Sequence, residues 1–192
     1  NDAVIQVNFT GPSSVENSLE TEFFISTESL YSPGPMGKRS SKACGRRRQL
    51  GVGRQFELEN IRMELDLGQG IPAIMAHDNR LQQVFFNLTT NARDAIIEKR
   101  GRLPGRPAGK ILIRTFQEGG QVVAEVDDDG IGISDAVRDK IFEPFFSTKE
   151  SSNDMGLGLA ITYGIVKDYG GDIQLTSQEG LGTTFKLSFA AT

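Results

Sequence analysis

The stretch Asp127-Asp128-Asp129-Gly130-Ile131-Gly132-Ile133 combines a structural signal with a chemical one. It directly follows a segment with strand character, so its carboxylates are expected at the end of a strand. Its glycines allow a tight turn and a close approach of the backbone to a ligand. A carboxylate at this place can accept a hydrogen bond from an exocyclic amino group such as that of adenine. The alternatives are a plain acidic turn or a weak calcium loop, although an EF-hand spreads its ligands over about twelve residues.

The segments on either side of this stretch read as a mixture of strands and helices. Strands are predicted at Ile61–Leu67 and Ile71–Ala76, and helices at Asp78–Arg100, Asp135–Ile141 and Gly158–Tyr169. Two antiparallel hairpins are predicted: Lys110–Phe116 with Gln121–Asp127, and Asp172–Ser177 with Thr183–Phe189. This mixture predicts a two-layer α/β sandwich, with helices on one face of a mixed sheet.

The first 54 residues differ in character and read as an irregular N-terminal segment or linker. A serine cap and acidic residues favour a helix over Val15–Phe24, and Ser32-Pro33-Gly34-Pro35 then interrupts any regular element. Residues 38–54 hold seven basic side chains and no acidic one. That composition indicates a solvated mobile loop, with a basic patch for a phosphate or an acidic partner as the alternative. The predicted division is therefore 1–54 for this segment and 55–192 for the folded domain.

The predicted helix Asp78–Arg100 contains the motif Asn87-Leu88-Thr89-Thr90-Asn91-Ala92-Arg93-Asp94-Ala95. Asn87 and Asn91 are four residues apart, so they share one face of the helix. An amide oxygen is a ligand that Mg²⁺ accepts beside waters and phosphate oxygens. The alternative is that both asparagines are ordinary surface residues. The stripe expected to face the core consists of Leu81, Val84, Phe85, Leu88, Ala92 and Ala95.

Three further segments follow along the chain. Met155-Gly156-Leu157-Gly158-Leu159-Ala160-Ile161 leads a glycine-rich chain into a helix, whose first N–H groups can bind phosphate. It is neither a Walker loop nor a dinucleotide fingerprint, and it could be a plain helix start. Phe142-Glu143-Pro144-Phe145-Phe146-Ser147-Thr148-Lys149 suggests an aromatic anchor for a polar lid, or a simple core plug. Gly180-Leu181-Gly182-Thr183-Thr184-Phe185 is by itself a hairpin turn.

In this order, the five segments resemble the N, G1, F, G2 and G3 boxes of histidine kinase catalytic domains. That family belongs to the wider gyrase, Hsp90, histidine kinase and MutL class, with its Bergerat-type ATP-binding fold. The asparagine and phenylalanine motifs most resemble the nitrogen-regulation type of kinase. The resemblance covers Phe56–Ala190. It implies a protein histidine kinase domain that binds ATP and Mg²⁺ and transfers the γ-phosphoryl group to a histidine.

The resemblance also implies a role for each matching residue. Asn91 would bind Mg²⁺ with Asn87 beside it, and Asp128 would accept the adenine amino group. Gly130 and Gly132 would let the base approach, and Gly156 and Gly158 would bracket the phosphates under a lid from Ser147 to Met155. Thr183 and Thr184 would lie near the adenine, and Ile133, Leu157 and Leu159 complete the expected nucleotide site. Arg93 and Lys149 are added as catalytic candidates that would neutralise phosphate charge.

Three features depart from the family pattern. Asp154 occupies the position where the second glycine box usually has another glycine, and its carboxylate would repel phosphate or point to water. The chain before Gln55 does not resemble the two-helix dimerisation segment, although it could be a remnant of that region. The only histidine, His77, precedes the asparagine helix at a strand-to-helix turn. It is expected to be structural, so the phosphoacceptor histidine would lie on a separate dimerisation domain.

Composition limits the partners of the chain. The net charge of −4 argues against nucleic acid. The single cysteine, Cys44, excludes an internal disulfide and is expected to be an incidental thiol. No apolar run approaches the roughly 18 residues that span a bilayer, so membrane contact is not expected of this segment. The implied partners are ATP, a histidine-bearing dimerisation domain and a response regulator receiver domain. The implied context is cytoplasmic, in a homodimeric full-length protein that an inner-membrane anchor could hold.

Three alternatives to a histidine kinase remain open at this point. A gyrase-type or Hsp90-type ATPase needs a carboxylate on the asparagine helix to activate water, and the residue before Asn87 is Phe86. A serine kinase that restrains a sigma factor shares the fold, but the Phe142–Lys149 segment fits it less well. A degenerate, nucleotide-free interaction domain is the third alternative, and Asp154 with the irregular N-terminal part keeps it open.

Overall fold

A five-stranded mixed sheet forms the centre of the protein. The computed structural model describes residues 3–10, 23–30, 46–50, 53–102, 105, 108–148 and 155–192. The strand order of the sheet is β4-β6-β7-β9-β8, with bounds Ile61–Leu67, Gly109–Glu118, Gln121–Asp128, Gly182–Ala190 and Asp172–Gln178. β4 runs parallel to β6, and the other neighbours are antiparallel. Both predicted hairpins and the mixed sheet are therefore confirmed.

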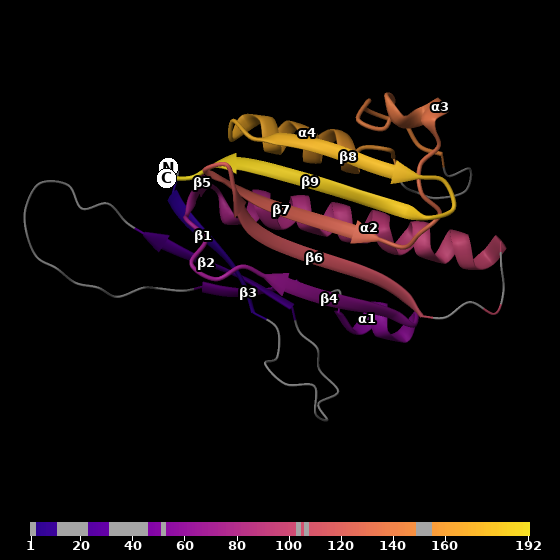
Figure 1. Ribbon diagram of the computed structural model, residues 1–192, viewed down its shortest axis with the longest axis horizontal. Coiled ribbons are helices and arrows are strands. Elements are labelled where there is room, and N and C mark those ends of the chain that lie inside the picture. Colours follow the sequence, from indigo (N-terminus) through magenta and orange to yellow (C-terminus); the bar gives the residue numbers. More distant parts are fainter. Residues whose placement is uncertain are drawn as a thin grey trace, which may run out of the picture.

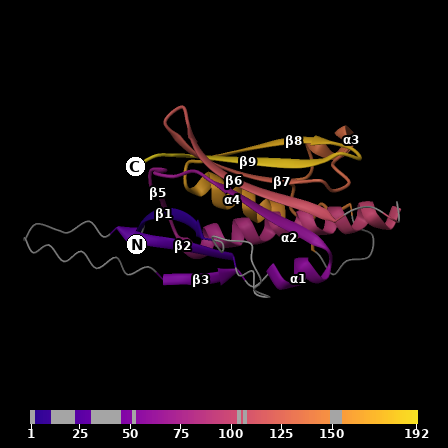
Figure 2. The same ribbon diagram turned by 60° about the horizontal axis from the view of Figure 1, so that its bottom comes forward.

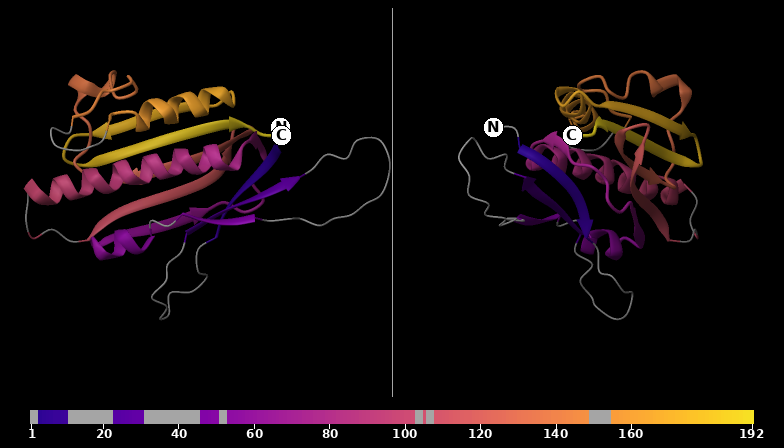
Figure 3. Two further views of the ribbon diagram at one scale, coloured as in Figure 1. Left: turned by 180° about the vertical axis from the view of Figure 1, so that it is seen from behind. Right: turned by 60° about the vertical axis from the view of Figure 1, so that its left-hand side comes forward.

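Two helices cover one face of this sheet. α2 (Asp78–Arg102) and α4 (Gly158–Asp168) pack against each other, and Figure 3 shows both from behind, in front of the strands. The short α3 (Asp135–Arg138) lies at one end of the sheet (Figure 1). The core lies between helices and sheet, because the inward side chains of the strands alternate with outward ones. The predicted two-layer sandwich is thus confirmed.

The buried stripe of α2 departs from the expected one at a single residue. Leu81, Val84, Phe85, Leu88 and Ala92 are buried as predicted, together with Thr89 and Ile96. Ala95 is only partly buried, because it lines a cavity rather than the core. The helix therefore changes role along its length, from core packing to forming the wall of a site.

The N-terminal part contains more regular structure than the sequence predicts. β1 (Ala3–Thr10), β2 (Phe23–Leu30) and β3 (Arg46–Leu50) form a second sheet with β5 (Ile74–Ala76), in the order β3-β2-β1-β5. These strands correct the expectation that residues 1–54 form an irregular segment. Their pairing provides hydrogen-bond partners for backbone N–H and C=O groups, and the composition of the segment does not predict that pairing. Figure 2 shows these strands on the side of the molecule where α1 (Gly53–Leu58) lies.

Several predictions for the first 54 residues fall outside the described part. The predicted helix over Val15–Phe24 falls mostly on residues 15–22, which are not described, and Phe23 and Phe24 belong to β2. Cys44 also lies outside the described residues. β3 occupies part of the stretch expected to be a loop. The division into 1–54 and 55–192 stays a prediction, and β1 and β5 pair across that boundary.

Within the described residues, none of the helices combines the length and apolar character that crossing a membrane requires.

Candidate functional site

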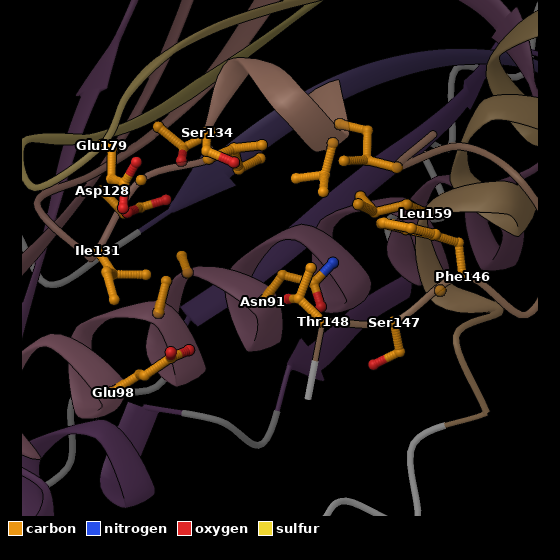
Figure 4. A pocket seen from close by; sticks show the side chains of 18 of the residues that line it. Asn91, Glu98, Asp128, Ile131, Ser134, Phe146, Ser147, Thr148, Leu159 and Glu179 are labelled. Carbon is orange, nitrogen blue, oxygen red and sulfur yellow. The ribbon is translucent and has the colours of Figure 1, made fainter. Parts of the chain in front are cut away.

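A cavity of about 320 Å³ opens between α2, the start of α4 and the turns at one end of the sheet (Figure 4). Its wall includes Asn91 from α2, Asp128 from the end of β7 and Gly158 from the start of α4. These residues are far apart in the sequence, and the fold brings them to one space. The phenylalanine and threonine segments also reach the wall, through Phe146, Ser147, Thr148 and Thr183.

Asp128 is the buried acceptor of this cavity. Only 7% of its surface is exposed, and its Oδ1 accepts the Gly130 N–H at 2.8 Å. Burial is the main reason why the pKa of Asp128 rises to about 7. The charges of Asp127 and Asp129 act in the same direction, and backbone hydrogen bonds from Gly130 and Thr183 oppose the rise. A carboxyl group held in this way offers acceptor positions to a ligand that carries N–H groups.

Two glycines let the chain close around Asp128. Gly132 has a φ of +74°, and a Cβ atom there would overlap the carbonyl oxygen of Gln178. A Cβ atom at Gly182 would overlap the carbonyl oxygen of Asp128 itself. At Gly130 a Cβ atom would lie 2.6 Å from that of Ala95, and the role expected for Gly130 at the base stays a prediction. The absence of a side chain at Gly130 allows α2 to pack closely against this turn, whereas Gly132 lies in the cavity wall.

The two asparagines of α2 have different surroundings. The Asn87 side-chain nitrogen donates to the Gly158 carbonyl oxygen at 3.0 Å and to the Thr162 hydroxyl at 3.3 Å. Thr162 is fully buried and also donates to the Gly158 carbonyl, at 2.9 Å. Asn87 therefore joins α2 to the first turn of α4. Asn91 lies one turn further along and lines the cavity.

The glycine-led start of α4 forms another wall. Gly156, Gly158 and Leu159 line the cavity, whereas Leu157 lies between them in the chain and is not part of the lining. Gly156 has a φ of +65°, and its carbonyl accepts the Phe145 N–H at 3.1 Å. This hydrogen bond holds Phe145 and Gly156 next to each other, although they are eleven residues apart in the sequence. Phe145 itself has a φ of +66° and is 74% exposed.

The aromatic anchor predicted from the sequence is formed by Phe142. Its ring lies 5.4 Å from that of Tyr163 and 6.4 Å from that of Phe185, and it packs against the core. Phe146 instead lines the cavity. Lys149 and Asp154 lie outside the described residues, so their predicted roles stay predictions.

Three predicted positions lie elsewhere. The Arg93 guanidinium pairs with Glu59 of the chain after α1 and with Asp94, and it is not part of the cavity lining, so its catalytic role stays a prediction. Thr184 donates to Asp127, on the opposite face of the sheet from Thr183, because successive strand residues alternate. His77 precedes α2 and contacts Tyr169, away from the cavity lining.

The family model described as histidine kinase-, DNA gyrase B-, and HSP90-like ATPase matches residues 76–192 of this chain. That stretch is well over half of the chain and contains the whole cavity lining. The chain belongs to this ATPase family. Sensor kinase CckA of Brucella abortus (strain 2308) is 42% identical over 135 residues, which are 67% of this chain and 14% of that protein. This histidine kinase-like domain thus spans about a seventh of that relative.

Solved structures place the domain among histidine kinase catalytic domains. The catalytic domain of histidine kinase ThkA has a TM-score of 0.61 and 29% sequence identity, covering 73% of this chain and 86% of that one. Full-length ShkA in complex with AMPPNP has a TM-score of 0.61 and 26% identity, covering 73% of this chain and 28% of that one. The Bergerat-type fold expected from the five boxes is therefore confirmed.

Sequence reasoning missed several residues of this histidine kinase-like site. Ser177 of β8 is 9% exposed, and its hydroxyl accepts the Ile133 N–H at 2.8 Å and donates to the Gly182 carbonyl at 2.9 Å. Glu179 lies near Asp128, and Glu98 lies at the same end of the cavity but further from Asp128, beyond Ile131 (Figure 4). Glu98 also pairs with Arg102, at 2.7 Å. None of them belongs to a box, so only their positions in the fold reveal them.

The donor set of the domain fits a magnesium ion that arrives with a nucleotide. The described residues contain no group of three or more His, Cys, Asp or Glu side chains that could hold a metal. Mg²⁺ usually keeps waters and substrate phosphates as ligands and takes few from the protein. The Asn91 amide lines the same cavity as Asp128 and the start of α4, and it would be the protein ligand of such an ion.

Proposed function

We propose that this chain is the ATP-binding catalytic domain of a two-component sensor histidine kinase. It would donate the γ-phosphoryl group of ATP to a histidine on a separate dimerisation domain, for relay to a response regulator. The observation that carries the proposal is the shared cavity, because a buried acceptor, an amide ligand and a glycine-led helix start lie around one space. ShkA, a structural neighbour, was solved with the ATP analogue AMPPNP.

The cavity has two chemically distinct ends. Asp128 and Thr183 supply acceptors suited to the amino group of adenine. Gly156 and Gly158 lie at the start of α4, where free N–H groups and the helix dipole favour phosphate oxygens. Asn91 of α2 lies between these ends (Figure 4) and would hold Mg²⁺. A bound magnesium ion supplies charge neutralisation at the phosphates.

The residues of α2 favour phosphoryl transfer to a partner over hydrolysis. The position before Asn87 is Phe86, which is 47% exposed and cannot activate water. Asp94 pairs with Arg93, and Glu98 lies at the Asp128 end of the cavity. The carboxylate of Asp94, three residues after Asn91, is therefore engaged by Arg93, which makes it a poor general base for water.

Transfer to an acceptor in trans tests the proposal. The chain is incubated with Mg²⁺ and radiolabelled ATP, alone and with a histidine-bearing dimerisation domain. Label should appear on the added domain only, and it should be labile to acid, as phosphohistidine is. Replacing the acceptor histidine by glutamine, or Asn91 by alanine in the chain, should abolish the label.

Other distributions of label would contradict the proposal in distinct ways. Acid-labile label on the isolated chain would show that the acceptor is not separate. Acid-stable label on a partner would identify a serine kinase, and steady phosphate release without a partner would identify an ATPase. Failure of the chain to bind ATP or ADP in a calorimeter would leave an interaction domain as the better description.

A further inference from the structure

Three polar side chains form a row across β7, β9 and β8 at the cavity end of the sheet. In the antiparallel registers, Asp128 is opposite Thr183, and Thr183 is opposite Ser177. Directly opposite residues share a face, and exposures of 7%, 5% and 9% place this row on the buried face. Asp128 and Thr183 line the cavity, whereas Ser177 lies one strand behind it.

The contacts of the Ser177 hydroxyl determine where its hydrogen lies. The Ile133 N–H can only donate to it, at 2.8 Å, and the Gly182 carbonyl can only accept from it, at 2.9 Å. A hydroxyl has one hydrogen to donate and two positions that accept. The third contact joins the Ser177 and Thr183 hydroxyl oxygens, at 3.0 Å. All three contacts are satisfied together only when Thr183 donates to Ser177.

We infer that Ser177 is a positioning residue that turns the Thr183 hydroxyl into an acceptor toward the nucleotide base. With its hydrogen directed at Ser177, the Thr183 hydroxyl presents only lone pairs to the cavity, beside the Asp128 carboxyl group. This wall suits an exocyclic amine, as in adenine. The same wall disfavours a base with a carbonyl oxygen at this place, such as hypoxanthine, because the acceptor oxygen of Thr183 would then face the acceptor oxygen of the base. The inference rests on the proposed function and assigns base preference to a residue outside the cavity.

Ser177 also holds the loop that follows β7. Its hydroxyl receives the Ile133 N–H, and its backbone carbonyl accepts from Arg138 at 2.7 Å. A substitution that removes the hydroxyl leaves the Ile133 N–H and the Gly182 carbonyl without this partner. It also frees the Thr183 hydroxyl to rotate and to donate to a ligand.

The ratio of ITP to ATP dissociation constants tests the assignment, because ITP carries a carbonyl where ATP carries the amine. Calorimetry with the magnesium complexes should show ATP binding more tightly to the wild type, by about tenfold or more. Ser177→Ala should lower this ratio by about tenfold, chiefly by weakening ATP. Thr183→Val should lower the ratio of ITP to ATP dissociation constants by a similar factor. The variant with both substitutions should lower this ratio no further, because Ser177 acts through Thr183.

A spectroscopic measurement and a matched variant accompany the titrations. The Ile133 amide should exchange with solvent faster in Ser177→Ala, because its hydrogen-bond acceptor is gone. Thr115→Val removes another buried hydroxyl of the same sheet, outside the cavity lining. That variant should leave both nucleotide affinities unchanged.

The outcomes separate this inference from the proposed function. Equal weakening of ATP and ITP by Ser177→Ala, or additive effects in the double variant, would overturn the Ser177 assignment alone. If Ser177→Ala does not fold, an unchanged ratio in Thr183→Val overturns it instead. A wild-type chain that binds neither nucleotide would overturn the proposed function, and the Ser177 assignment with it.

Discussion

At the scale of single residues, Asp128 couples the site to the stability of the fold. Its pKa rises from 3.8 to about 7, chiefly because burial disfavours the charged form. Between these two values the native state retains a proton that the unfolded state has lost. The contribution of Asp128 to stability therefore falls as the pH rises from about 4 to about 7, and is constant above that range.

Asp128→Asn should separate ligand binding from stability. Above pH 7, the free energy of unfolding of the variant should exceed that of the wild type by on the order of 1–4 kcal/mol, because the variant carries no buried charge at this position. The advantage should shrink toward pH 4. ATP affinity should fall, since the amide presents a donor as well as an acceptor to the adenine amine. Urea titrations at pH 5 and pH 8 with calorimetry check both, and unchanged ATP affinity would remove Asp128 from the base site.

At the scale of elements, arginines of α2 hold the chain that follows α1. Arg93 makes a two-point ion pair with Glu59, and both side chains are about three-quarters buried. Arg100 donates to the backbone carbonyls of Glu59 and Asn60, which follow the last turn of α1. The pair holds the pKa of Glu59 below its usual value, chiefly through the hydrogen bond from Arg93.

Arg93→Ala should therefore reduce stability without affecting nucleotide binding. A loss of about 1–3 kcal/mol is expected at neutral pH, because the ion pair is charge-assisted and partly buried. The loss should diminish as the pH falls through the lowered pKa of Glu59, where that carboxyl becomes protonated. Arg80→Ala, which removes a more exposed pair with Asp168, is the matched control and should cost less. A marked loss of ATP affinity in Arg93→Ala would restore Arg93 to the phosphate site.

At the scale of the whole molecule, the cavity depends on elements that meet only in the folded state. Its walls come from α2, the turn after β7, the phenylalanine segment, the start of α4 and the turn before β9. The unfolded chain has no such arrangement, so a nucleotide that binds there should stabilise the entire domain.

Magnesium ATP should raise the free energy of unfolding of the chain in a concentration-dependent way. At a ligand concentration a hundred times the dissociation constant, the expected gain is about 2.7 kcal/mol. Thermal unfolding followed by circular dichroism measures the shift, and Asp128→Asn should show a smaller one at the same concentrations. An unchanged melting temperature at saturating magnesium ATP would contradict the proposed site.

Local sequence predicted the main elements because their signals are short-range. The alternation in Ile61–Leu67 and the apolar stripe of α2 each reflect contact with a single core, so the strand was predicted correctly and the stripe was too, except at Ala95. The strands β1, β2 and β3 were missed because 12 residues separate β1 from β2 and 15 separate β2 from β3, so no short hairpin turn marks their pairing. The catalytic role of Arg93 stays a prediction, and the sequence did not reveal its ion pair with Glu59, because charge alone does not indicate which side chain neutralises it.

The sequence by itself determined the order of the five motifs, the mixed sheet and several of the residues that line the cavity, such as Asn91, Asp128 and Gly158, since spacing and residue type are properties of the chain. Only the tertiary structure decided that Ser177 stands behind Thr183, that Thr184 faces the other side of the sheet, and that Gly130 packs against α2. The physical reason is that hydrogen-bond direction and close packing depend on neighbours across strands, which lie far away along the chain.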